Sequence, residues 1–181
     1  MGHCDVSKII WEFGIAVERC EFSGDSVKAR ILYRISSVLL LLFAAGHTLG
    51  FRETDPKWGV DSLIGSMRSV RFDAQGFSRT YWDFYIGFGL FVSVFLVFAA
   101  VLAWQLGGLA PETLALMRGP AWALAICFAA VTILSWRYFF IAPLVSSLAI
   151  TVCLTAAAWL SAKRMLRRTV VASRPKTSKR V

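Results

Sequence analysis

Three ionisable residues near the ends of long apolar segments could do chemistry together: His47, Asp83 and Arg137. A histidine that is paired with a carboxylate and steadied by an arginine suits proton transfer. It also suits a polar pocket for the headgroup of a quinone or another lipophilic ligand. Glu53 and Arg79 are the nearest further charged candidates. Each of the three stands on a different apolar segment, so only the fold can bring them together.

The same residues also have ordinary structural roles, and the sequence leaves both interpretations open. In the structural one, Asp83 caps its helix, Arg137 reaches the membrane interface and His47 bonds a backbone carbonyl. His47 is the only histidine inside an apolar segment. A haem held by two histidines or a metal site would therefore lack ligands within one chain. The sequence assigns no catalytic residue and no cofactor, and a lipid or a quinone is the ligand class that such a pocket would take.

The elements that must position these residues are four apolar segments of about 20 residues each, long enough to cross a hydrocarbon core of about 30 Å. The whole chain of 181 residues is 57% hydrophobic, with a mean hydropathy of +0.61. Because lipid cannot satisfy a free peptide group, each segment should be helical. We predict an all-α polytopic membrane protein, a four-helix bundle forming one domain over residues 31–162. Its spans are residues 31–51, 84–106, 121–140 and 143–162.

Positive charge predicts the orientation of the spans. The tail, residues 163–181, holds eight lysines and arginines and no acid, which accounts for most of the net charge of +9. Lys and Arg near span ends are retained in the cytoplasm. The tail and the N-terminal segment, residues 1–30, should therefore be cytoplasmic and the loop at 52–82 outside. This indicates a multi-pass protein of a bacterial inner membrane whose tail meets anionic lipid headgroups rather than nucleic acid.

Two segments outside the spans have the periodicity of amphipathic helices that lie on the membrane surface. In the outer loop, Asp55 and Pro56 form a helix start signal, an N-cap followed by proline. Apolar residues at helical spacing follow it. The N-terminal stripe consists of Val6, Ile9, Ile10, Phe13 and Val17, and the outer stripe of Val60, Leu63, Ile64, Met67 and Val70.

Caps and small residues mark helix ends and packing faces. Thr80 and Asp83 have the spacing of a capping box at the start of the second span. Gly46 and Gly50 form a GxxxG pair in the first span, and Gly89 with Ser93 forms a similar pair in the second. Small residues at this spacing let helix backbones approach closely. We expect them to pack the bundle, with self-association or docking to another protein as the alternative.

Three short stretches resemble a known group. They are residues 44–51 (AAGHTLGF), residues 83–91 (DFYIGFGLF) and residues 138–143 (YFFIAP). Together they look like the small four-helix bacterial membrane proteins allied to the DoxX-like group, over about residues 30–162. The resemblance implies a four-helix fold. It also implies an accessory role, because some relatives resemble subunits that accompany quinone-linked oxidoreductases.

Size favours a non-catalytic function. Outside the spans, the tail and the two surface helices, little chain remains to build an active site. We therefore predict an accessory or structural subunit of a larger membrane complex, which is redox-active or quinone-linked. Its partners would be the bilayer and other membrane subunits or a second copy. The alternative is a membrane enzyme or binding protein for a lipophilic ligand that uses His47, Asp83 and Arg137.

Overall fold

The computed structural model describes residues 24–172, with side chains to residue 162. Four of its helices are long and apolar enough to cross a membrane, which confirms the predicted fold class. The stripe predicted at residues 6–17 and the tail after residue 172 lie outside the described residues. The long helices are α1 (Gly24–Gly50), α3 (Tyr81–Gly108), α5 (Arg118–Tyr138) and α6 (Ile141–Ala172). The short elements are η1 (Pro56–Trp58), α2 (Asp61–Ser69), β1 (Arg71–Ala74), β2 (Phe77–Thr80) and α4 (Pro111–Leu116).

Two of the long helices, α1 and α6, are clearly longer than the spans predicted from the apolar segments. α1 begins at Gly24, seven residues before the predicted span at residue 31, and α6 continues to Ala172. Hydropathy marks only the part of a helix that lies in hydrocarbon, whereas backbone hydrogen bonding continues until a residue breaks it. The basic residues Lys28 and Arg30, which precede the predicted span, therefore stand on the first turns of α1.

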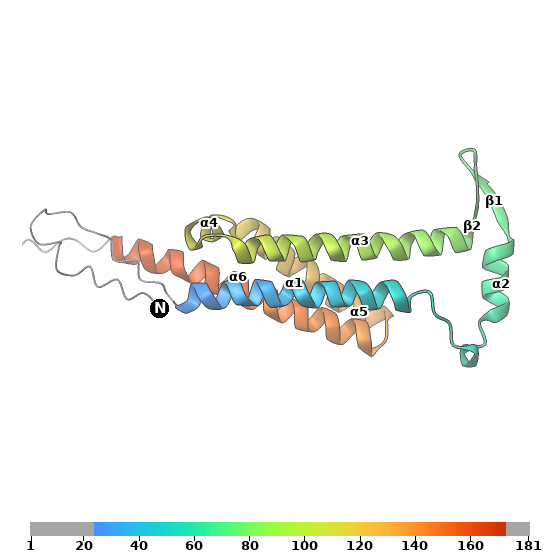
Figure 1. Ribbon diagram of the computed structural model, residues 1–181, viewed down its shortest axis with the longest axis horizontal. Helices are drawn as coiled ribbons and strands as arrows, with labels where there is room; N and C mark the ends of the chain where they lie inside the picture. Colours follow the sequence, from blue (N-terminus) through green and yellow to red (C-terminus); the bar gives the residue numbers. More distant parts are fainter. Residues whose placement is uncertain (1–23, 173–181) are drawn as a thin grey trace, which may run out of the picture.

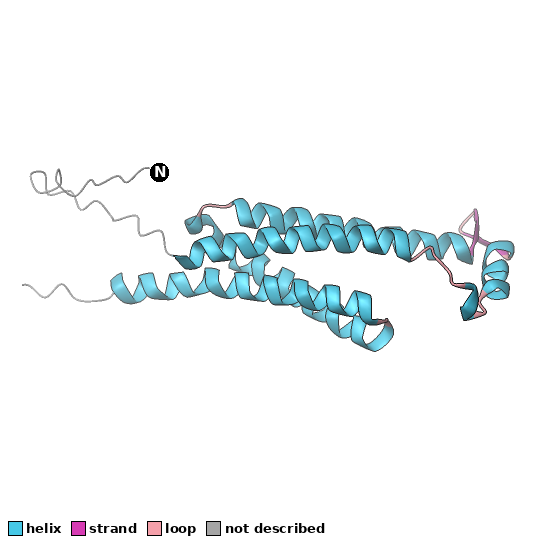
Figure 2. Ribbon diagram, turned by 60° about the horizontal axis from the view of Figure 1, so that its bottom comes forward, coloured by secondary structure: helices cyan, strands magenta, loops and turns pink. Residues whose placement is uncertain are grey.

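The four long helices pack lengthwise against one another (Figures 1 and 2). α1 packs along α3 on one side and α6 on the other, and α5 packs against α6. The start of α1 and the end of α6 lie at one end of the molecule, and the loop between α1 and α3, predicted to be the outer loop, lies at the other (Figure 1). The fully buried side chains at the centre include Tyr33 and Leu40 of α1 with Ile150 and Leu154 of α6.

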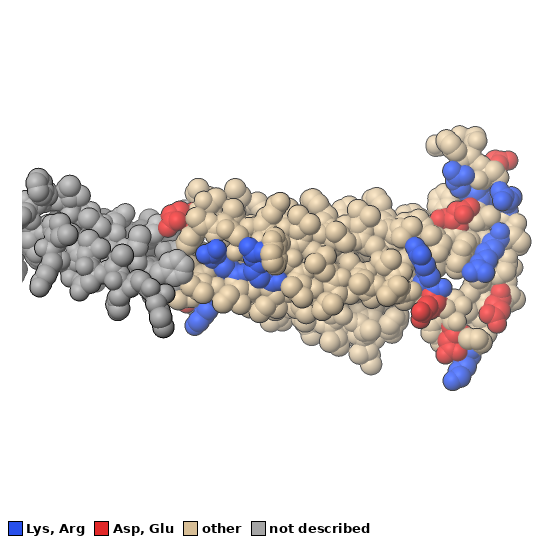
Figure 3. All heavy atoms as spheres, in the orientation of Figure 1, with Lys and Arg blue, Asp and Glu red and all other residues tan. Residues whose placement is uncertain are grey.

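Much of the helix surface is apolar and exposed, as a lipid solvent requires. Charged side chains gather toward the two ends of the molecule, and a long band of the visible face between them carries none (Figure 3). α3 exposes large apolar side chains along most of its length. Such a surface is stable in contact with lipid tails, which are as apolar as the helix itself.

The outer loop differs from the prediction in two ways. Asp55 caps the short η1 helix by accepting a hydrogen bond from the Lys57 amide, and does not cap the longer helix. Gly59, in the left-handed conformation at φ 64°, ends η1, so α2 begins only at Asp61. The loop then forms an antiparallel hairpin, β1 with β2, which the sequence analysis did not predict. Its turn places Gln75 and Gly76 at positive φ, the conformation of a two-residue hairpin turn.

Candidate functional site

His47 lies in the contact between α1 and α3. Its Nε2 is 3.1 Å from the carbonyl oxygen of Gly89, and its half-buried ring stacks on Phe51 at 5.2 Å between centroids. Because a carbonyl only accepts, Nε2 must carry the proton in this bond. Ser93 Oγ donates to the same carbonyl at 3.2 Å. In this geometry the histidine ties the first span to the second through a backbone group.

The small residues predicted to pack helices have two different environments. A Cβ at Gly89 would collide with the Phe51 ring, and Ser93 is buried and accepts a hydrogen bond from Thr48 at 2.7 Å. This pair lies where α3 meets α1. Gly46 and Gly50 are exposed, and a Cβ at either would have no heavy atom within 4 Å. The GxxxG face of α1 is thus turned away from the other described helices.

Asp83 closes the predicted capping box at the start of α3. Its Oδ2 accepts from the backbone amide of Thr80 at 2.8 Å and from the Thr80 hydroxyl at 2.9 Å. The Thr80 hydroxyl oxygen in turn accepts from the Asp83 amide at 3.1 Å. The box fixes the carboxylate on the first turn of α3, where the residue itself is exposed.

Arg137 stands on the last turn of α5, exposed, with its guanidinium 5.9 Å from the Tyr138 ring centroid. α5 packs against α6, whereas His47 and Asp83 belong to the α1 and α3 pair. Glu53 is exposed in the outer loop. Within residues 24–162 no recorded hydrogen bond or ion pair joins His47, Asp83 and Arg137.

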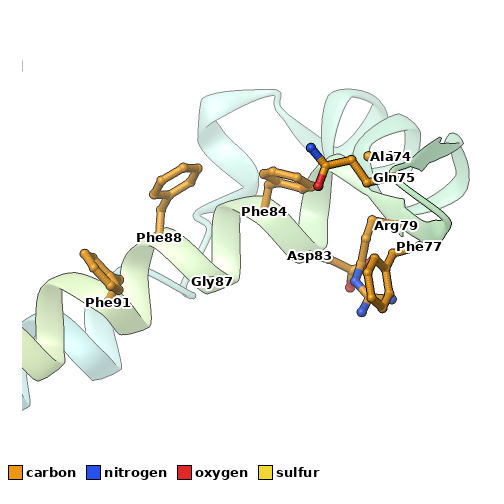
Figure 4. A pocket seen from close by; sticks show the side chains of 9 residues that line it. All are labelled: Ala74, Gln75, Phe77, Arg79, Asp83, Phe84, Gly87, Phe88 and Phe91. Carbon is orange, nitrogen blue, oxygen red and sulfur yellow. The ribbon is translucent and has the colours of Figure 1, made fainter.

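A groove of about 710 Å³ lies between the hairpin and the outer end of α3 (Figure 4). Two of the predicted charged candidates, Arg79 and Asp83, line it. The aromatic wall was missed by the sequence analysis, although phenylalanines at alternating spacings of four and three are visible in residues 84–98. The lining residues are Ala74, Gln75, Phe77, Arg79, Asp83, Phe84, Gly87, Phe88 and Phe91.

The fold and its surface define a small integral membrane protein with four packed helices that can span a bilayer. No family model, curated protein or solved structure matches the chain. The resemblance to the DoxX-like group therefore gains no support from a family match. Among the described residues, no group of three or more His, Cys, Asp or Glu side chains could hold a metal ion.

Proposed function

We propose that this protein is a non-catalytic accessory subunit of a larger membrane complex. It binds a transmembrane helix of its partner through the outward face of α1. The observation that carries the proposal is the open GxxxG pair, Gly46 and Gly50, at the outer half of that helix. In lipid, helices associate mainly by close packing, and small residues permit the closest approach.

The surface around this pair suits a helix. Leu42 and Leu49, beside the glycines, are 64% and 71% exposed and would supply side chains to pack against a partner. Next to them a shallow apolar groove of about 410 Å³ runs between α1 and α3. Helices pack by fitting ridges of side chains into such grooves. The groove is lined by Leu41, Ala44, Ala45, Thr48, Leu49 and Val97.

The contacts of the candidate catalytic residues support a non-catalytic function. His47 bonds the backbone of α3 and Asp83 caps that helix, so both side chains hold the fold together. The link to redox or quinone chemistry is part of the proposal and rests on the resemblance described above. If the complex is quinone-linked, its quinone-dependent activity should survive His47→Ala, because the histidine holds α1 against α3 and takes no part in the reaction.

The test is the double variant Gly46→Leu with Gly50→Leu, compared with the native chain for co-migration with a larger complex on native gels of solubilised membranes. We expect the variant to leave the complex, because two leucines would hold the partner backbone away. Open space around both glycines should let the chain itself fold. Gly87→Leu on α3, also exposed and open, is the matched control and should stay in the complex.

Full retention of the double variant in the complex would refute this surface. A complex with twice the mass of the chain would identify the partner as a second copy.

The proposal includes an orientation with both chain ends in the cytoplasm. It is supported by Lys28, Arg30 and Arg34 at the end of α1 remote from the outer loop. In a chain without its native cysteines, a cysteine at Lys57 should react with an impermeant reagent from outside, and one at Leu116 should not. Labelling of both from one side would refute the orientation.

A further inference from the structure

We propose that the groove between the hairpin and α3 binds a zwitterionic phospholipid. The headgroup phosphate contacts Arg79, the headgroup ammonium contacts Asp83, and one acyl chain lies along the phenylalanine wall of α3. This site is separate from the face of α1 to which the function is assigned. The site uses Arg79 and Asp83, two of the charged residues that the sequence predicted, and needs neither His47 nor Arg137.

The groove is built from a fixed hairpin and an open helix face. Phe72 of β1 packs against the rings of Tyr81 and Phe84, at 5.0 and 5.5 Å between centroids, which holds the hairpin on α3. Gly87 lines the groove, is exposed, and has open space where a side chain would stand. In Figure 4 the labelled hairpin residues lie on the same side of this glycine as Asp83 and Phe84, and Phe88 and Phe91 lie on the other.

The two charged groups of the lining match a headgroup that carries both signs. Arg79 uses Nη1 to donate to the Ser78 carbonyl at 2.9 Å, and a guanidinium has five N–H donors in all. The recorded bonds of the Asp83 carboxylate both end on Oδ2. The planar guanidinium of arginine can bind a phosphate through two parallel N–H donors, and the carboxylate Oδ1 can accept from an ammonium. A purely anionic lipid would instead bring a negative headgroup against Asp83.

The apolar wall is longer than one leaflet. Phe84, Phe88 and Phe91 of the groove are continued by Phe95 and Phe98, all of them exposed on α3. Their alternating spacing of four and three residues keeps them on one stripe of the helix. From Phe84 to Phe95 the helix rises about 16 Å. That is about half of a hydrocarbon core of about 30 Å. A chain entering from the outer leaflet would therefore lie against phenylalanine over its length.

The experiment measures which lipids stay bound to the purified protein. The full chain is reconstituted with equal amounts of phosphatidylethanolamine and phosphatidylglycerol, extracted in mild detergent and weighed by native mass spectrometry. We expect the ethanolamine lipid to be retained in preference. Arg79→Gln should lower its retention about tenfold, the scale expected for loss of a charge-assisted hydrogen bond. Gly87→Leu should lower it as well by filling the groove.

Two matched variants serve as controls. Arg137→Gln removes an exposed arginine outside the groove, and Gly46→Leu fills open space on α1; both should retain the lipid as the native chain does. Equal retention of the two lipids by the native chain would overturn the proposal, as would full retention by Gly87→Leu. In the co-migration test the double variant Gly46→Leu with Gly50→Leu should lose the complex and Gly87→Leu should keep it. Here Gly87→Leu should lose the lipid and Gly46→Leu should keep it, so failure of one proposal is distinguishable from failure of the other.

Discussion

Two helix contacts in this molecule are built differently. The contact between α1 and α3 is crossed by hydrogen bonds along its whole length, whereas between the described parts of α5 and α6 we find the bond of Thr132 with Thr151, at 3.0 Å. The bonds at the α1 and α3 contact are Arg30 Nε to Gly107 O at 3.2 Å, Ser37 Oγ to Ala100 O at 2.8 Å, Thr48 to Ser93 at 2.7 Å, His47 to Gly89 O at 3.1 Å and Tyr85 Oη to Phe51 O at 2.6 Å.

The connections between the helices explain this difference. α5 and α6 are joined by Phe139 and Phe140 alone, and so short a turn sets the register of an antiparallel pair. α1 and α3 are separated by residues 51–80, and a long connection leaves their register open. Because lipid provides no hydrophobic drive for two helices to meet, register must come from close packing and from polar bonds. The α1 and α3 pair therefore has both.

The largest effect is expected from Gly107→Leu, at the inner end of the α1 and α3 contact. A Cβ there would stand 3.0 Å from the Arg30 carbonyl oxygen and 3.2 Å from the Tyr33 Cβ. Since backbone cannot move aside easily, the variant should lower the free energy of unfolding in bicelles by about 1–3 kcal/mol. Gly46→Leu, in open space, is the control and should change it by less than about 0.5 kcal/mol. If Gly107→Leu and Gly46→Leu lowered the free energy of unfolding equally, close packing would not distinguish the α1 and α3 contact.

A smaller effect is expected for the polar bonds of the same contact. A double-mutant cycle with Thr48→Val and Ser93→Ala should give a coupling energy of about 0.6 kcal/mol, with about 1.7 kcal/mol as the upper end for such bonds in membranes. The cycle is needed because the single hydroxyl proton of Thr48 is shared between Ser93 and the Ala44 carbonyl, which lies 2.7 Å away within its own helix. The unfolding free energies of the four chains provide the measurement, and zero coupling would show that this bond does not hold the pair.

The smallest effect is expected for Thr132→Val with Thr151→Val, the equivalent cycle between α5 and α6. Here the turn already sets the register, so the coupling in the unfolding free energy should be less than that of Thr48 with Ser93. Inserting a flexible glycine and serine linker between Phe139 and Phe140 should raise the coupling energy between Thr132 and Thr151. A coupling larger than that of Thr48 with Ser93 in the native turn would contradict the explanation from connection length.

The sequence predicted more of the fold than of the candidate site. The spans and the Thr80 and Asp83 capping box follow from residues close together in the chain. The predicted cluster was inferred from the positions of His47, Asp83 and Arg137 near the ends of their apolar segments, which place them at similar depths in the membrane. Depth does not say which helices are neighbours, and α5 packs on α6. The hairpin was not predicted, because its turn, Gln75 with Gly76, is a weaker signal than the apolar stripe before it.

Local chemistry by itself determined the number of spanning helices and the capping box at the start of α3. An apolar span and a helix cap are each formed by residues that are close together in the chain, so the sequence shows them directly. Only the tertiary structure decided that Gly89 meets Phe51 while Gly46 and Gly50 meet nothing in the described chain. The physical reason is the solvent. A helix face toward lipid and one toward another helix are both apolar, so hydropathy does not distinguish them.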